Sequence, residues 1–246
     1  MYEILLAVAI FLCLLGAAWI GLFSNSKLPS KHLQDDTNAT VRLVANLFVV
    51  MTSLTVGLMM TSAKSSLDAN DRNVHALATD IILLDRTMRA LGPISDETHR
   101  HLIEYVQSSL KAPSIVDEDP VAEAFLDAVG TSLRRLRLSG EQQTALWNDA
   151  RALYRQTVQQ RWVVVEQPGG TIPTLLIVVL IGWLTIIFAS FGYRAPHNAV
   201  VLTSFVLAAL LISATLFLIL DMDTPATGFI RVSGQPIQRA LAELER

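Results

Sequence analysis

Two aspartates end the last long apolar run of the chain, in the stretch LILDMDTPATGF. Asp221 and Asp223 supply carboxylate oxygens, the ligands that hard cations prefer. A helix C-terminus carries a partial negative charge, so carboxylates placed there need compensation. Three interpretations are open: the aspartates mark the boundary to water, paired with Arg231; they bind a cation; or they form a ring of charge at a pore entrance.

A second set of polar residues lies inside an apolar run. Asn46, Ser53 and Gly57 fall on one helical stripe, with Arg42 at its mouth. Such residues either let helices pack closely through small side chains and hydrogen bonds, or form the wet wall of a pathway. Small residues four positions apart, which also suit closely packed helices, occur at three places: Ala17 and Gly21, Ser53 and Gly57, and Ser204 and Ala208.

Four apolar runs must position these residues. Each run lacks Asp, Glu, Lys and Arg, and together they cover residues 4–23, 43–63, 172–193 and 199–220. A helix of about 20 residues crosses a hydrocarbon core of roughly 30 Å, so every run is long enough to span. The composition agrees: 52% of the residues are hydrophobic and 17% are charged, against about 25% charged in soluble domains. The sequence therefore predicts four transmembrane helices.

The order of the runs predicts the domain organisation. Residues 1–63 and 171–220 form two transmembrane hairpins, residues 64–170 form a domain between them, and residues 221–246 form a tail. Lys and Arg near the spans are more numerous on the side of the central domain, and such residues favour the cytoplasm. We therefore expect an all-α protein of the inner membrane, with a helical cytoplasmic domain inserted between the second and third spans and both termini cytoplasmic.

The central domain shows helical periodicity throughout. Its first apolar seam consists of Val74, Leu77, Ile81, Leu84, Met88 and Leu91. Gly92-Pro93 ends this helix. The seam either packs within a cytoplasmic bundle, or continues the second span and packs against neighbouring subunits. A later helix has its apolar positions at the following residues: Val121, Phe125, Ala128, Ser132 and Leu136.

Several function classes find no support in the sequence. The five histidines form no metal-binding pattern, and the phosphate-binding, nucleophile-elbow and zincin motifs are absent. We therefore expect neither an enzyme nor a cofactor, apart from the cation site considered at Asp221 and Asp223. The formal net charge of −3 gives no reason to expect nucleic acid as a partner.

Three stretches together resemble a known family: TSAKSSLD with ATDIILLDR, RWVVVEQPGGTIPTLLIVVLIGWLTIIFASFGYRAPHN, and LFLILDMDTPATGFIRVSGQPIQRAL. In this order they are similar to the bestrophin-like domain family of bacterial membrane proteins, over almost the entire chain. The resemblance implies a relation to bestrophins, which are oligomeric anion channels with four spans per subunit, cytosolic termini and acidic residues after a membrane helix that take part in calcium binding.

The resemblance and the polar residues lead to one expectation with one alternative. We expect a homo-oligomer in the lipid bilayer that conducts inorganic anions, its wall formed by Asn46, Ser53 and Gly57 and its far mouth by Arg42. Asp221 and Asp223 would brace the inner end or hold a cation. The alternative is a non-conducting scaffold or stress-sensing protein that recruits a partner through its cytoplasmic helices.

Overall fold

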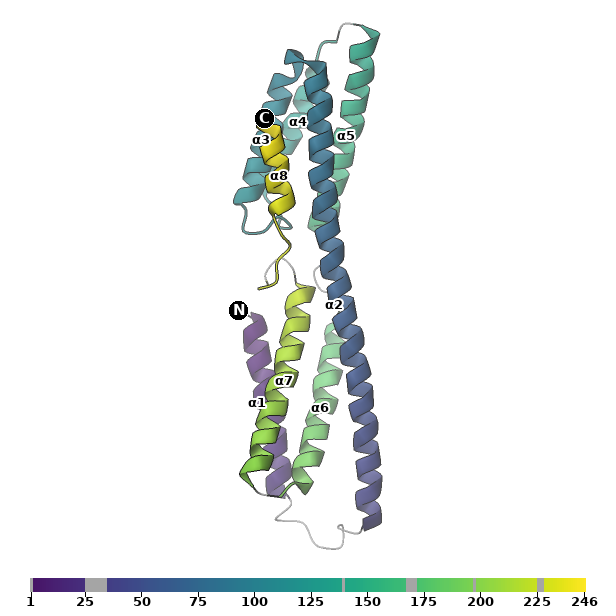
Figure 1. The fold of residues 1–246 in the computed structure, drawn as a ribbon, viewed down its shortest axis with the longest axis vertical. Helices are drawn as coiled ribbons and strands as arrows, with labels where there is room; N and C mark the ends of the chain where they lie inside the picture. Colours follow the sequence, from purple (N-terminus) through teal and green to yellow (C-terminus); the bar gives the residue numbers. More distant parts are fainter. Residues whose placement is uncertain (1, 25–34, 139, 167–171, 197, 225–227) are drawn as a thin grey trace. The chain divides into compact units, whose positions relative to one another are not determined.

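The computed structural model describes residues 2–24, 35–138, 140–166, 172–196, 198–224 and 228–246, and over these residues the chain contains helices and no strand (Figure 1). The elements are α1 (Tyr2–Ser24), α2 (Asp35–Leu91), the short 3-10 helix η2 (Pro93–Ser95), α3 (Asp96–Lys111), α4 (Pro120–Arg135), α5 (Glu141–Glu166), α6 (Thr174–Arg194), α7 (Ala199–Asp223) and α8 (Gln235–Leu244). Helices α1, α6, α7 and the first part of α2 are long and apolar enough to cross a membrane. The all-α class and the four apolar helices predicted from the sequence are thus confirmed.

The chain divides into two compact units. The first unit contains residues 1–66 and 170–224, and the second contains residues 67–169 and 225–246. Helix α2 contributes its first part to the first unit and its second part to the second unit. The apolar helices belong to the first unit, and the charged helices belong to the second.

Helix α1 forms the centre of packing in the first unit, where it contacts both α6 and α7. Its crossing with α6 leaves no room for a side chain at Gly21 or at Gly192. A Cβ added at Gly21 would overlap the carbonyl oxygen of Ala189 and lie 2.7 Å from the Tyr193 nitrogen, and a Cβ at Gly192 would overlap the Ala18 carbonyl. The pair of Ala17 and Gly21 therefore lies in a tight helix contact, as its four-residue spacing predicts.

The first part of α2 is packed far less. Only 11% of its apolar window is buried, against 28% in α1, 28% in α6 and 17% in α7. Among the described α2 residues, Met59 and Ala63 are buried in the core of the first unit, and the partly buried Val56 packs against it. Most of the remaining apolar surface of this part of α2 is left open by the chain itself.

The second part of α2 has the opposite surroundings. All six residues of the predicted seam, Val74 to Leu91, are buried in the core of the second unit. The helix ends at Leu91, because Gly92 adopts a left-handed φ of 77° that favours glycine. The Ser95 hydroxyl then donates to the Met88 carbonyl at 2.6 Å. Helix α2 thus continues without a break from the span, and its seam packs within its own chain.

Helix α4 has the predicted period but a different buried face. Val121 is 58% exposed, whereas its buried apolar residues are Ala122, Leu126, Val129 and Leu133. Of the residues predicted at helical spacing, Ser132 is buried, Phe125, Ala128 and Leu136 are partly buried, and Val121 is exposed. The Tyr154 ring of α5 occupies the place where a Cβ at Gly130 would lie, so α4 and α5 pack closely at this glycine.

The segment expected to be a tail contributes to the second core. Helix α8 packs on α3, and Ile237, Ala240 and Leu244 are buried in the same cluster as the α2 seam. Ten residues are too few for an isolated stable helix in water, so tertiary contacts must stabilise α8.

Candidate functional site

The polar stripe of α2 lies on the side that its own chain leaves open. Asn46, Ser53 and Gly57 are all exposed, and a Cβ at Gly57 would meet no atom within 4 Å. Ala45, Met59 and Ala63, which are buried, occupy a different face of the helix. Arg42 belongs to α2 one turn before Asn46, and its side chain is outside the part of the chain that the structure describes. Asn46, Ser53 and Gly57 therefore lie together on one exposed surface of α2. They are not buried between helices of the same chain.

An apolar cavity of about 430 Å³ lies beside the stripe, between α2, α6 and α7. Ser53 reaches its edge, and Phe188, Phe191 and Phe205 form part of its wall. The other hydroxyl groups of the wall are satisfied within their own helices: Thr52 donates to the Phe48 carbonyl at 2.7 Å and Thr215 to the Leu211 carbonyl at 2.8 Å. The cavity consequently offers almost only hydrocarbon contacts.

Asp221 and Asp223 both lie in the last turn of α7. The helix extends to Asp223, three residues beyond the predicted end of the span, and the two aspartates are 0% and 3% exposed. The Ile172 N–H donates to Asp223 Oδ2 at 3.2 Å. Because Ile172 lies two residues before the start of α6, this bond places a carboxylate near the positive end of that helix, a favourable arrangement. Asp223 therefore links the end of α7 to the start of α6.

The three interpretations of these aspartates fare differently. Their burial does not fit a simple boundary to water, where carboxylates would be solvated. The Arg231 Nε donates to the Gly228 carbonyl at 3.1 Å, and its pairing with the aspartates stays a prediction. Among the described residues, no group of three or more His, Cys, Asp or Glu side chains is arranged to hold a metal ion. A cation at these aspartates would need carbonyl or water oxygens as additional ligands.

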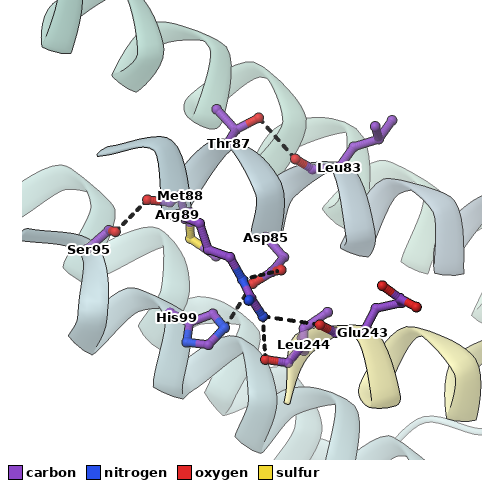
Figure 2. A network of polar contacts seen from close by, with 9 residues as sticks. All are labelled: Leu83, Asp85, Thr87, Met88, Arg89, Ser95, His99, Glu243 and Leu244. Atoms are coloured by element: carbon purple, nitrogen blue, oxygen red, sulfur yellow. Dashed lines mark hydrogen bonds and ion pairs between the residues drawn. The ribbon is translucent and has the colours of Figure 1, made fainter. Parts of the chain in front are cut away.

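A network of charged groups at the end of α2 was not foreseen from the sequence. Figure 2 shows Asp85 between Arg89 and His99: Arg89 Nε lies 2.9 Å from Oδ2 and His99 Nε2 lies 2.8 Å from Oδ1. The contact with His99 is close in distance but lacks hydrogen-bond geometry. Burial raises the pKa of Asp85, and the neighbouring Arg89 and His99 act in the opposite direction.

Arg89 connects this network to the C-terminal helix. Its Nη2 donates to the carbonyls of Glu243 and Leu244, at 3.1 and 2.6 Å (Figure 2). These carbonyls belong to the last turn of α8, which has no intrahelical donors for them, and a cation is favoured there. The sequence signal was the spacing of Asp85 and Arg89, which are one turn apart beside the apolar seam. Their partner in α8 is too distant in sequence to be inferred.

Comparison with known proteins gives one match. The family model of the bestrophin-like domain matches residues 12–237, nearly the whole chain. No curated protein and no solved structure matches the chain. The matched range includes three complete apolar helices, most of α1 and the second unit up to the first three residues of α8. The chain is therefore a multi-pass membrane protein that belongs to the bestrophin-like family.

Proposed function

We propose that this chain is one subunit of a homo-oligomeric, anion-permeable pore in the bacterial inner membrane, with α2 as the central wall. The observation that carries the proposal is the exposed polar stripe on the least buried of the four apolar helices. A polar side chain that faces hydrocarbon without a partner is costly. The stripe is therefore better placed against water or against a neighbouring subunit than against lipid.

The spacing of the stripe supports a continuous wall. Asn46, Ser53, Gly57 and Lys64 follow one another at intervals of seven, four and seven residues, which keeps them on one face of a helix. Subunits arranged around an axis would bring these faces together. The pair of Ser53 and Gly57 would then permit close approach of neighbouring helices or leave a wide, polar passage.

Charge supports anions as the permeant ions. Arg42 and Lys64 stand at the two ends of the apolar part of α2, and no Asp or Glu lies between them. Basic residues at the mouths of a pore attract anions and repel cations. In this scheme the second unit and both termini are cytoplasmic, in keeping with the distribution of Lys and Arg near the spans.

The aspartates have a supporting role in this scheme. Asp221 and Asp223 are buried, and Asp223 accepts from Ile172 at the start of α6. These contacts support a brace at the inner end of the pore more than a ring of charge at its entrance. A cation bound there would strengthen the same brace.

The experiment is chloride flux into liposomes that contain the purified protein, with potassium flux for comparison. We expect Asn46→Leu to reduce chloride flux severalfold. Thr203→Leu is the matched control, because it also removes a polar group from an exposed position in a span, but on α7. A combined Asp221→Ala and Asp223→Ala variant tests the brace. Absence of flux in folded, correctly inserted wild-type protein would contradict the pore and favour the scaffold.

A further inference from the structure

The corner where α4 ends and α5 begins concentrates positive charge. Arg134 and Arg135 lie in the last turn of α4, and Arg137 follows its C-cap residue Leu136. All three arginines are exposed. One or two cations at a helix C-terminus are explained by the helix dipole. Arg137 is outside the helix and needs another explanation.

Helix α5 adds a fourth arginine to this corner. The Trp147 indole N–H donates to the Leu133 carbonyl at 2.8 Å, which fixes the tryptophan against the end of α4. The Arg151 guanidinium lies over the Trp147 ring, 4.5 Å from its centre. The stacking holds Arg151 on a tryptophan that is itself bonded to the last turns of α4. We call these four residues the arginine corner: Arg134, Arg135, Arg137 and Arg151.

The charge of the arginine corner is not neutralised by ion pairs. No described acidic side chain lies within ion-pair distance of any of the four, although Asp85 and Glu243 form such pairs elsewhere in the same unit. Arg134 donates instead to the Thr131 hydroxyl at 3.1 Å. Nearby acids are few, namely Asp127, Glu141 and Asp149. The corner is therefore locally basic in a chain whose net charge is −3.

The chemistry of the corner indicates its partner. All four cations are arginines, whose planar guanidinium groups bind carboxylates in a bidentate fashion. One face of Trp147 is already covered by Arg151, so that face is not free to stack on a nucleic-acid base. The basic area is also short, in contrast to the long basic stripes of nucleic-acid-binding domains. These features favour a compact segment rich in carboxylates.

We propose that the arginine corner is a docking surface for an acidic peptide segment of another protein. Arg134, Arg135 and Arg137 make the contacts, and Arg151 is held in place by Trp147 to complete the positive field. This surface belongs to the second unit alone and does not depend on whether the chain conducts ions. It would operate in a channel and in a scaffold alike.

The test is binding of a fluorescein-labelled polyglutamate peptide to the full chain in phosphatidylcholine nanodiscs, followed by fluorescence anisotropy. We expect saturable binding that weakens with added salt, because the contacts are exposed charges. A variant with Arg134→Gln, Arg135→Gln and Arg137→Gln should bind roughly tenfold more weakly. Arg137→Gln alone, which lies outside the helix, should weaken binding partly and covers the case in which the triple variant does not fold.

A matched control separates a local surface from overall charge. The variant with Arg72→Gln, Arg239→Gln and Arg246→Gln removes the same charge from exposed positions of the same unit and should bind within about twofold of wild type. Equal weakening of both triple variants, or no binding by wild type, would overturn the proposal. Tighter binding of a homopolymeric RNA than of polyglutamate would assign the corner to nucleic acid and also overturn it.

Discussion

The two parts of α2 have opposite surroundings in one continuous helix. In the second unit, every residue of the apolar seam from Val74 to Leu91 is buried by other helices of the same chain. In the first unit, only 11% of the apolar window is buried, and the polar stripe with Gly57 is open. The apolar seam of the second part is covered within one subunit. The exposed surface of the first part must instead be covered by lipid, water or another subunit.

The contrast recurs between two pairs of small residues. Ala17 and Gly21 lie in a contact so close that a Cβ at Gly21 would overlap the Ala189 backbone. Ser53 and Gly57 have the same four-residue spacing, but nothing lies within 4 Å of a Cβ at Gly57. The spacing thus indicates that a helix can be approached closely. It does not say whether the approaching helix comes from the same chain.

The largest expected difference in stability is between truncations of one apolar side chain in each part of α2. Ile81 is fully buried, so Ile81→Ala should lower the free energy of unfolding of the second unit by about 2–5 kcal/mol. Leu54 is 65% exposed in the single chain, so Leu54→Ala should cost less than about 1 kcal/mol in detergent-solubilised monomer. Chemical unfolding followed by circular dichroism measures both. Equal costs would remove the distinction between the two parts.

Replacing Gly21 or Gly57 by alanine should change the stability by a smaller amount, and with opposite signs at the two positions. Gly21→Ala should destabilise the first unit by about 1–3 kcal/mol, because backbone atoms of α6 would have to move. Gly57→Ala meets no neighbour and improves helix propensity, so it should be neutral or stabilising by up to about 1 kcal/mol in the monomer. Thermal unfolding in detergent compares them. Destabilisation of the monomer by Gly57→Ala would show that this face is already packed within the chain.

The smallest effect is a pH dependence within the packed part of α2. Asp80 is buried and accepts from Gln156 Nε2 at 2.8 Å, and burial raises its pKa above 3.8 while this hydrogen bond opposes the rise. A carboxyl whose pKa is raised on folding contributes stability at low pH that is lost as the pH rises through the folded value. The stability of Asp80→Asn relative to wild type should therefore increase as the pH rises above 3.8.

Thermal unfolding of both proteins at about pH 4 and about pH 7 measures this change. The control is Asp71→Asn, which replaces a less buried aspartate on the same helix. A relative stability of Asp80→Asn that falls with rising pH would contradict the assigned direction.

Much of the fold follows from local patterns in the sequence. The four apolar runs exceed the length that a span needs, and Gly92-Pro93 and Pro120 place helix boundaries where α2 ends and α4 begins. The seam of α2 has a period that only a helix satisfies. These features depend on composition and on neighbours within one or two turns, so the sequence contains them.

The features that were missed depend on distant contacts. Helix α8 is short, and its place in the core depends on α3 and on Arg89, which is more than a hundred residues away. The close packing of α4 on α5 at Gly130 depends on Tyr154, which is 24 residues further along the chain. The stripe residues were identified from their spacing, but their openness to the outside of the chain could be seen only in the structure.

Cysteine accessibility along α2 tests the central claim most directly. Cys13 is the only cysteine, so a Cys13→Ser background allows one cysteine to be placed at each position from Asn46 to Leu58. In proteoliposomes, a charged thiol reagent should modify cysteines at Asn46, Ser53 and Gly57 and spare those at Leu47, Leu54 and Leu58, because only the stripe would face water. Modification of the leucine positions alone, or of none, would contradict a water-filled path along α2.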